Sequence, residues 1–112
     1  MIIKDYYTNG GKNLILKYIE ELPIKQKVYA YRIRNKIEED GLDAFDILDT
    51  RQIRGKLYEI RFYDQRIMYL IRDSDVVYFL HICKKQKNKA LQRDLRIAIR
   101  RAKELGYKIC GD

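Results

Sequence analysis

The chain has 112 residues, 46% of them hydrophobic, and carries 24 lysines and arginines against 16 aspartates and glutamates, for a net charge of +8. This apolar content is typical of a folded domain and excludes a disordered tail. No apolar run approaches the roughly 18–20 residues that a membrane-spanning helix needs. The N-terminus also lacks the apolar core and cleavage site of a secretory signal. We therefore expect one domain over residues 1–112.

The N-terminal part predicts a strand followed by a helical hairpin. Residues 1–7 are typical of a short strand, and Asn9-Gly10-Gly11 supplies a turn. Apolar residues then recur at helical spacing from Leu14 to Leu22, with Asn13 as the expected cap, and Pro23 ends this helix. A second helix is predicted over Ile24–Asp40, with Gly41 at its end.

The central part predicts an antiparallel meander. Residues 42–54 contain three acids without a clear period, so we expect a loop with at most a turn of helix. Three runs rich in Ile, Val, Tyr and Phe follow at 56–63, 66–72 and 76–83, joined by short connections. In the first run Tyr58, Ile60 and Phe62 share one face of the strand.

The last element is predicted to be a basic amphipathic helix. Its apolar positions step by three and four, as do basic positions on another side. The apolar set is Leu91, Leu95, Ala98, Ala102 and Leu105, and the basic set is Lys89, Arg93, Arg96, Arg100 and Lys103. The fold class is therefore α+β, with an N-terminal strand, a two-helix hairpin, a three-stranded meander and a C-terminal helix.

The positive charge is concentrated at this C-terminal end. Residues 84–108 contain ten basic residues and two acids, and the rest of the chain holds 14 of each. A charge surplus on one element creates a local positive field, which attracts polyanions, acidic partners or anionic membranes.

The cysteines and the histidine do not form a recognisable metal motif. Cys83 and Cys110 make no CxxC pair, and His81 is the single histidine, so a zinc site is not expected. Two cysteines in a chain with an ordinary core favour reduced thiols and a cytoplasmic location. A Ser–His–Asp triad is also not expected, because Ser74 lies in a turn away from His81.

A group of cations remains as the candidate site. Arg61, Arg66, Lys84 and Lys85 converge at one edge of the meander if its strands pair as predicted, with Lys87 and Lys89 just beyond. Such a cluster suits internal cleavage of RNA without a metal, because Arg holds phosphate oxygens and Lys can act as base or acid when neighbouring cations lower its pKa. The 2′-OH must lose a proton, the phosphorus gains negative charge, and the 5′-oxygen must be protonated.

Ordered pieces of the second half of the chain resemble the HigB/RelE superfamily of bacterial toxins, in particular its phage-derived Gp49-like HigB branch. That branch carries the patterns LxELR, YRxLY, LLHxFxKKxxK and ExxxAxxR. The matching pieces are Leu57-Tyr58-Glu59-Ile60-Arg61, Arg66-Ile67-Met68-Tyr69, Phe79-Leu80-His81, Lys85, Lys89, and Asp94, Ala98 and Arg101. Gln86 stands where the branch usually has a second Lys, and Cys83 stands where it has an aromatic residue.

The resemblance implies a RelE/HigB-like toxin domain with a microbial RNase-like fold and no cofactor. It further implies cleavage of mRNA on the translating ribosome, a HigA-type helix-turn-helix antitoxin as partner, and repression of operator DNA by the toxin–antitoxin complex. Arg61 and Arg66 match positions where related toxins place catalytic basic residues, and Lys85 is a third.

Further residues are candidates with more than one interpretation. Glu59 is either a general base or the partner that orients an Arg by a salt bridge, and His81 is either catalytic or a packed histidine that titrates near neutrality. The remaining cations are candidates for RNA binding, or else solvated surface. They are Arg54, Lys84, Lys87, Lys89 and Arg93.

Two alternative functions remain open at this stage. ParE-type toxins share the architecture and poison DNA gyrase instead of cutting RNA. A non-catalytic, basic nucleic-acid-binding module would show salt-sensitive binding and no cleavage.

Overall fold

The computed structural model describes residues 1–85 and 88–109, and their side chains except those of residues 88–91. The elements in chain order are β1 (Ile2–Asp5), α1 (Leu14–Glu20), α2 (Ile24–Asp40), the 3₁₀ turn η1 (Gly41–Asp43), α3 (Ala44–Ile47), β2 (Thr50–Arg54), β3 (Leu57–Phe62), β4 (Gln65–Ile71), β5 (Val76–Lys84) and α4 (Asn88–Glu104). None of the helices in the described residues is long and apolar enough to cross a membrane.

The strands form one five-stranded sheet in the order β1-β5-β4-β3-β2. The pairs β2–β3, β3–β4 and β4–β5 are antiparallel, whereas β1 pairs with β5 in parallel. The α+β class, the N-terminal strand, the helical hairpin and the meander of β3, β4 and β5 are therefore confirmed.

The prediction for residues 42–54 was right about a turn of helix, but the expected loop contains a strand. This segment holds most of η1, all of α3, and β2, which pairs with β3 at the edge of the sheet. The register of this pair shifts between Gln52 and Arg54. The bulge breaks the two-residue alternation by which a strand is recognised, so β2 is defined by its pairing with β3 and not by its own pattern.

The residues predicted to begin and end the first two helices are found at those positions. The Asn13 side chain accepts a hydrogen bond from the backbone N–H of Leu16 at 2.9 Å, which satisfies a donor that the first turn of α1 leaves open. Helix α2 begins after Pro23 and ends at Gly41, whose φ of 64° suits glycine and few other residues.

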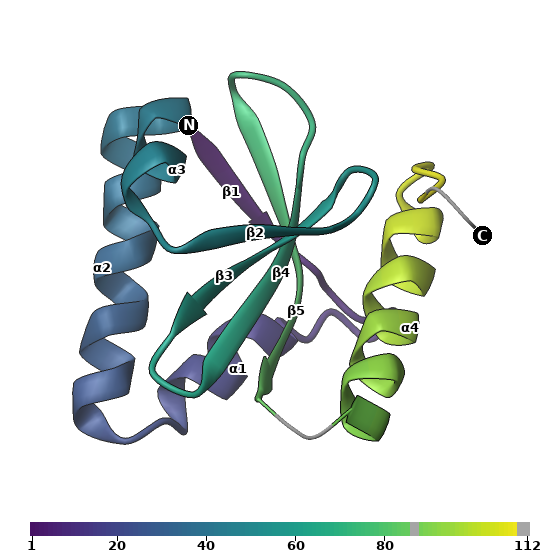
Figure 1. Ribbon diagram of the computed structural model, residues 1–112, viewed down its shortest axis with the longest axis horizontal. Helices are drawn as coiled ribbons and strands as arrows, with labels where there is room; N and C mark the ends of the chain where they lie inside the picture. Colours follow the sequence, from purple (N-terminus) through teal and green to yellow (C-terminus); the bar gives the residue numbers. More distant parts are fainter. Residues whose placement is uncertain (86–87, 110–112) are drawn as a thin grey trace.

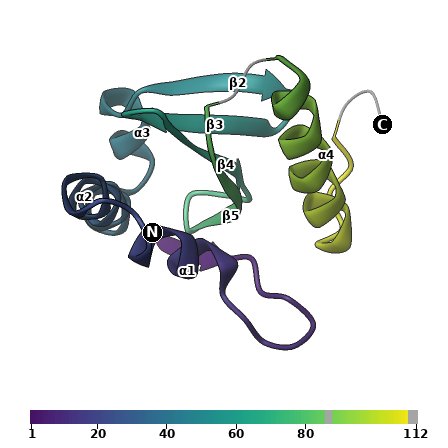
Figure 2. The same cartoon turned by 90° about the horizontal axis from the view of Figure 1, so that it is seen from below.

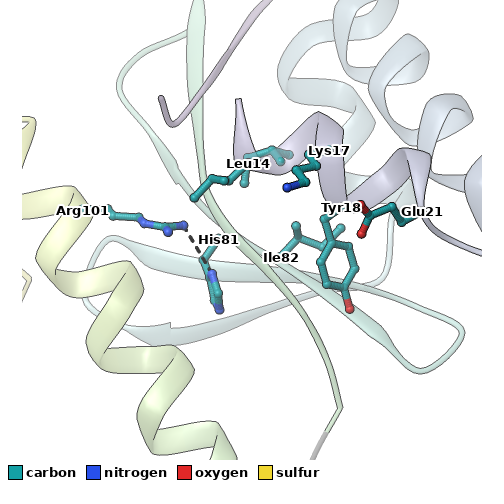
Figure 3. Close-up of a pocket in the computed structure, with 8 residues that line it drawn as sticks. Leu14, Lys17, Tyr18, Glu21, His81, Ile82 and Arg101 are labelled. Carbon is teal, nitrogen blue, oxygen red and sulfur yellow. Dashed lines mark hydrogen bonds between the residues drawn. The ribbon is translucent and has the colours of Figure 1, made fainter. Parts of the chain in front are cut away.

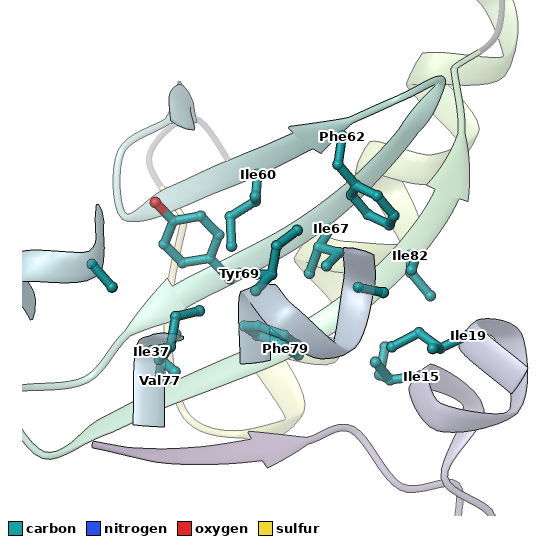
Figure 4. Packing of buried hydrophobic residues seen from close by; sticks show 13 residues of the cluster. Ile15, Ile19, Ile37, Ile60, Phe62, Ile67, Tyr69, Val77, Phe79 and Ile82 are labelled. Carbon is teal, nitrogen blue, oxygen red and sulfur yellow. The ribbon is translucent and has the colours of Figure 1, made fainter. Parts of the chain in front are cut away.

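Helices cover both faces of the sheet (Figures 1 and 2). Helices α1 and α2 pack on one face over a cluster of buried sheet residues that includes Ile60, Ile67 and Phe79 (Figure 4). Helix α4 packs on the other face, where Ala98 and Ala102 are fully buried in a second cluster. Leu105, predicted in the apolar stripe, is instead 40% exposed, because α4 ends one residue before it.

A β-bulge in β5 directs two consecutive side chains to α4. Met68 lies opposite His81 and Tyr69 opposite Phe79, so Leu80 is the extra residue in β5. Leu80 belongs to the cluster under α4, and His81 hydrogen-bonds Asp94 on the same helix. Without the bulge, alternation would turn one of these neighbours to the opposite face.

Overpacking the contact between α4 and the sheet should destabilise the protein. Ala98 is fully buried, so Ala98→Leu forces several methyl groups into a filled space and should lower the free energy of unfolding by about 1–3 kcal/mol in urea denaturation. The matched control Arg96→Leu adds the same side chain at an exposed position of α4 and should change stability by no more than about 0.5 kcal/mol. Equal stability of the two variants would contradict the buried packing of α4.

Candidate functional site

The predicted cations gather at one end of the sheet. Arg61 on β3 and Arg66 on β4 are direct cross-strand partners, so their side chains emerge on the same face, which α4 covers. Lys85 follows β5 at the same end, where its backbone N–H donates to the Asp64 carbonyl in the β3–β4 turn at 2.6 Å. The structure thus brings Arg61, Arg66 and Lys85 to one end of the molecule.

Glu59 holds Arg66 in place. Its Oε2 lies 3.3 Å from Arg66 Nη1, and the two side chains are only 8% and 14% exposed. A pair this buried is costly to break, because either partner alone would remain as an unpaired charge. The geometry fits the interpretation of Glu59 as the residue that orients an arginine.

Arg61 is more exposed than Arg66 and is held by a different carboxylate, that of Asp49. Its Nη2 donates to Asp49 Oδ1 at 3.0 Å, and the Arg61 side chain is 29% exposed. The buried Nε of Arg61 has no acceptor among the described residues. The exposed part of the Arg61 guanidinium is suited to an oxygen of an anionic ligand.

His81 lies between two charged residues of α4. Its Nε2 is 2.8 Å from Asp94 Oδ1, and Arg101 Nη1 donates to the Leu80 carbonyl at 2.8 Å. The same Arg101 Nη1 lies 3.4 Å from His81 Nδ1 (Figure 3). Because a guanidinium can only donate, Nδ1 is the acceptor, and the ring proton resides on Nε2, facing Asp94. Burial lowers the pKa of His81 below its ordinary value of 6.5, and Asp94 opposes this shift only in part. His81 is thus a neutral imidazole of defined tautomer.

Asp94 and Arg101 match the ExxxAxxR pattern in the sequence, but they were not predicted to be site residues. Their spacing from Ala98, four residues and three, is the signal that places all three on one side of α4. Arg101 is 9% exposed, and its guanidinium lies 4.3 Å from the centre of the Tyr6 ring. Helix α4 thereby supplies two charged partners to a strand histidine, in addition to its apolar contacts.

A pocket gives access to His81 from the side of α1. It has a volume of about 230 Å³ and is lined by Leu14, Ile15, Lys17, Tyr18, Glu21, His81, Ile82 and Arg101 (Figure 3). It lies where β5 continues beyond the end of β1, whose pairing stops at Phe79, so no strand covers this edge. His81 and Arg101 can therefore be reached by a small group that enters between α1 and α4.

The structure describes the side chains of three other RNA-binding candidates, Lys84, Arg93 and Arg54. Lys84 is opposite Gln65, on the face of α1 and α2, and its Nζ lies 3.5 Å from Asp64 Oδ2. Arg93 is exposed on α4, and Arg54 borders a groove of about 630 Å³ along that helix. Lys87 and the side chain of Lys89 lie outside the described residues.

A sequence model of the phage-derived Gp49-like proteins matches residues 17–103. The chain belongs to this family. The family is associated with HigB/RelE-like toxins of toxin–antitoxin systems. No curated protein matches the chain.

The match to the Gp49-like family spans the whole candidate site. It begins in α1 and ends at the last turn of α4, so it includes both arginines of the sheet, Glu59, and the His81–Asp94–Arg101 contacts.

One group of potential metal ligands lies within the described part of this Gp49-like chain. His81, Cys83 and Asp94 each offer a ligand atom, and these atoms lie within 4.8 Å of one another.

The pKa of the single histidine can be measured directly by NMR. In the wild-type Gp49-like protein it should lie below 6.5, and Asp94→Asn should lower it further, because Asp94 stabilises the charged ring. Glu104→Gln, on the same helix, should leave it unchanged. Since folding favours the neutral ring, the contribution of His81 to stability should be lost as the pH falls from 6.5 through the folded pKa. A wild-type pKa above 6.5, or a rise in Asp94→Asn, would contradict this geometry.

Proposed function

We propose that this Gp49-like protein is the toxin of a type II toxin–antitoxin system and acts in the cytoplasm as a ribosome-dependent endoribonuclease of the HigB type. The observation that carries the proposal is the direct pairing of Arg61 with Arg66 on one face of the sheet. Two arginines so placed match the charge that develops on a phosphodiester during cleavage. The family association with toxins supports the biological setting.

Arg61 and Arg66 bind the scissile phosphate in the proposed mechanism. Glu59 fixes the position of Arg66, and the partly exposed guanidinium of Arg61 is available to a phosphate oxygen. As charge builds up on the five-coordinate phosphorus, these fixed donors stabilise the transition state more than the ground state, which is the requirement for catalysis.

His81 and Lys85 are the candidates for proton transfer. Neutral His81 carries a lone pair on Nδ1 and a proton on Nε2, so it has the groups needed to accept and to supply a proton. Lys85 is exposed at the same end of the sheet and can contribute a proton or a phosphate contact. The reaction is attack by the 2′-OH on the adjacent phosphorus with departure of the 5′-oxygen, and it proceeds without a metal.

The exposed basic side of α4 is proposed to dock the ribosome. Arg93, Arg96, Arg100 and Lys103 are exposed there, with no carboxylate partner among the described side chains. Unpaired cations on one helix attract the phosphate backbone of ribosomal RNA. We also propose a HigA-type helix-turn-helix antitoxin, which inhibits the toxin and joins it in binding operator DNA.

Arg61→Ala should reduce cleavage of translated mRNA by roughly 10²–10³-fold, the usual cost of one well-placed transition-state donor. Primer extension on messages isolated after induction measures this effect, together with relief of growth arrest. The partner Asp49 is 59% exposed, so the fold should tolerate the loss of Arg61.

The matched control for this variant is Arg72→Ala, which removes an exposed arginine just beyond the opposite end of β4 and should retain full cleavage. Full toxicity of Arg61→Ala at equal expression would overturn the assignment of the site. Gyrase-linked DNA breaks without mRNA cleavage would overturn the proposed activity.

A further inference from the structure

Three potential metal ligands of different chemistry meet beneath α4. His81 and Cys83 are two residues apart on β5, so their side chains emerge on the same face of the sheet, and Asp94 reaches them from the first half of α4. The ligand atoms of all three lie within 4.8 Å of one another, and the His81 and Asp94 atoms are already 2.8 Å apart.

We propose that His81, Cys83 and Asp94 form a site for a divalent transition metal, with zinc as the best fit. A set of one imidazole, one thiolate and one carboxylate matches zinc, which binds nitrogen, sulphur and oxygen in tetrahedral geometry. Bonds of about 2.0–2.3 Å in that geometry separate the ligand atoms by about 3.3–3.8 Å. Movements of about 1 Å therefore suffice to close the site.

The electrostatic surroundings of Cys83 favour a cation in place of the thiol proton. The Asp94 carboxylate lies near the Cys83 thiol, and so does the Glu59 carboxylate, whose charge is partly offset by its pair with Arg66. The same carboxylates that oppose a bare thiolate attract a dication. Binding releases the thiol proton to solvent and forms the metal–sulphur bond, so the thiolate and Asp94 together neutralise the metal charge.

Ligation of a metal through Nε2, the nitrogen that faces Asp94, requires the ring proton to move from Nε2 to Nδ1. The 3.4 Å contact between Nδ1 and Arg101 Nη1 is then lost, because both atoms donate, while Arg101 keeps its shorter bond to the Leu80 carbonyl at 2.8 Å. The side chains of His81 and Asp94 are 14% and 15% exposed, so the fourth position opens to solvent and takes a water. Three protein ligands and one open position are typical of accessible zinc sites.

Metal binding would have a consequence that rests on the proposed function. A metal on Nε2 removes His81 from proton transfer and occupies the space beside Arg66, the cross-strand partner of Cys83. The bound form would then be inactive as a nuclease. The site itself does not depend on that activity, and its test uses binding alone.

Cobalt titration of the purified, untagged protein tests the site, because the chain contains one histidine and two cysteines. Cobalt should bind at one equivalent with a near-ultraviolet thiolate-to-cobalt charge-transfer band and the intense visible bands of a tetrahedral ion, and zinc should abolish both. Cys83→Ser should eliminate the charge-transfer band. Asp94→Asn and His81→Gln should weaken cobalt binding at least about tenfold. Even the loss of a residue that only hydrogen-bonds a metal ligand typically lowers metal affinity by about 10–100-fold.

Cys110→Ser is the matched control and should bind cobalt as the wild type does. Circular dichroism of each variant verifies that it is folded. Absence of the charge-transfer band in the wild type overturns the proposal regardless of how the variants behave. A band that survives in Cys83→Ser and disappears in Cys110→Ser would also overturn it. A protein that binds cobalt as expected and cuts no RNA would retain the metal site and lose the nuclease function.

Discussion

The close packing of α4 against the β3–β5 surface is the constraint on which the candidate site depends. Two fully buried alanines, Ala98 and Ala102, let the helix approach the sheet, and the same turns of α4 carry Asp94 and Arg101. The β5 bulge sends Leu80 into the apolar contact and His81 to the charged residues. Packing and chemistry thus use one interface, because the helix that closes the second core also sets the tautomer of the histidine.

The charged residues at this interface fall into a buried group and a more exposed group. Close to the helix, the buried pair of Glu59 and Arg66 and the contacts of His81 fix the side chains before any ligand arrives. Farther out, Arg61 and Lys85 lie nearer to solvent at the end of the sheet, where a long polyanion can reach them. In the proposed mechanism, these fixed inner groups and accessible outer cations serve as the preorganised positive site for phosphodiester cleavage, so that little reorganisation remains to be done during the reaction.

The sequence predicted what short-range patterns encode. Runs rich in β-branched and aromatic residues marked β3 to β5, Asn13 and Pro23 marked the helical hairpin, and the short connections predicted that Arg61 and Arg66 converge. It did not predict β2, whose pairing is interrupted by a bulge, nor the meeting of Asp94 with His81 and Cys83. That meeting depends on how far α4 slides along the sheet, which the two alanines determine through tertiary packing. The sequence has no CxxC pair and no second histidine, and it therefore gave no reason to expect the metal site proposed here.

The most direct test of the account replaces the attacking group of the RNA. Ribosomes programmed with an mRNA that carries a single 2′-deoxy nucleotide at the mapped cleavage position are incubated with the toxin in the presence of a chelator. The account predicts that the all-ribose message is cut to leave a 5′-hydroxyl end, whereas the 2′-deoxy message stays intact at that position. Cleavage of the 2′-deoxy message at an equal rate, or no cleavage of either message by the folded protein, would contradict it.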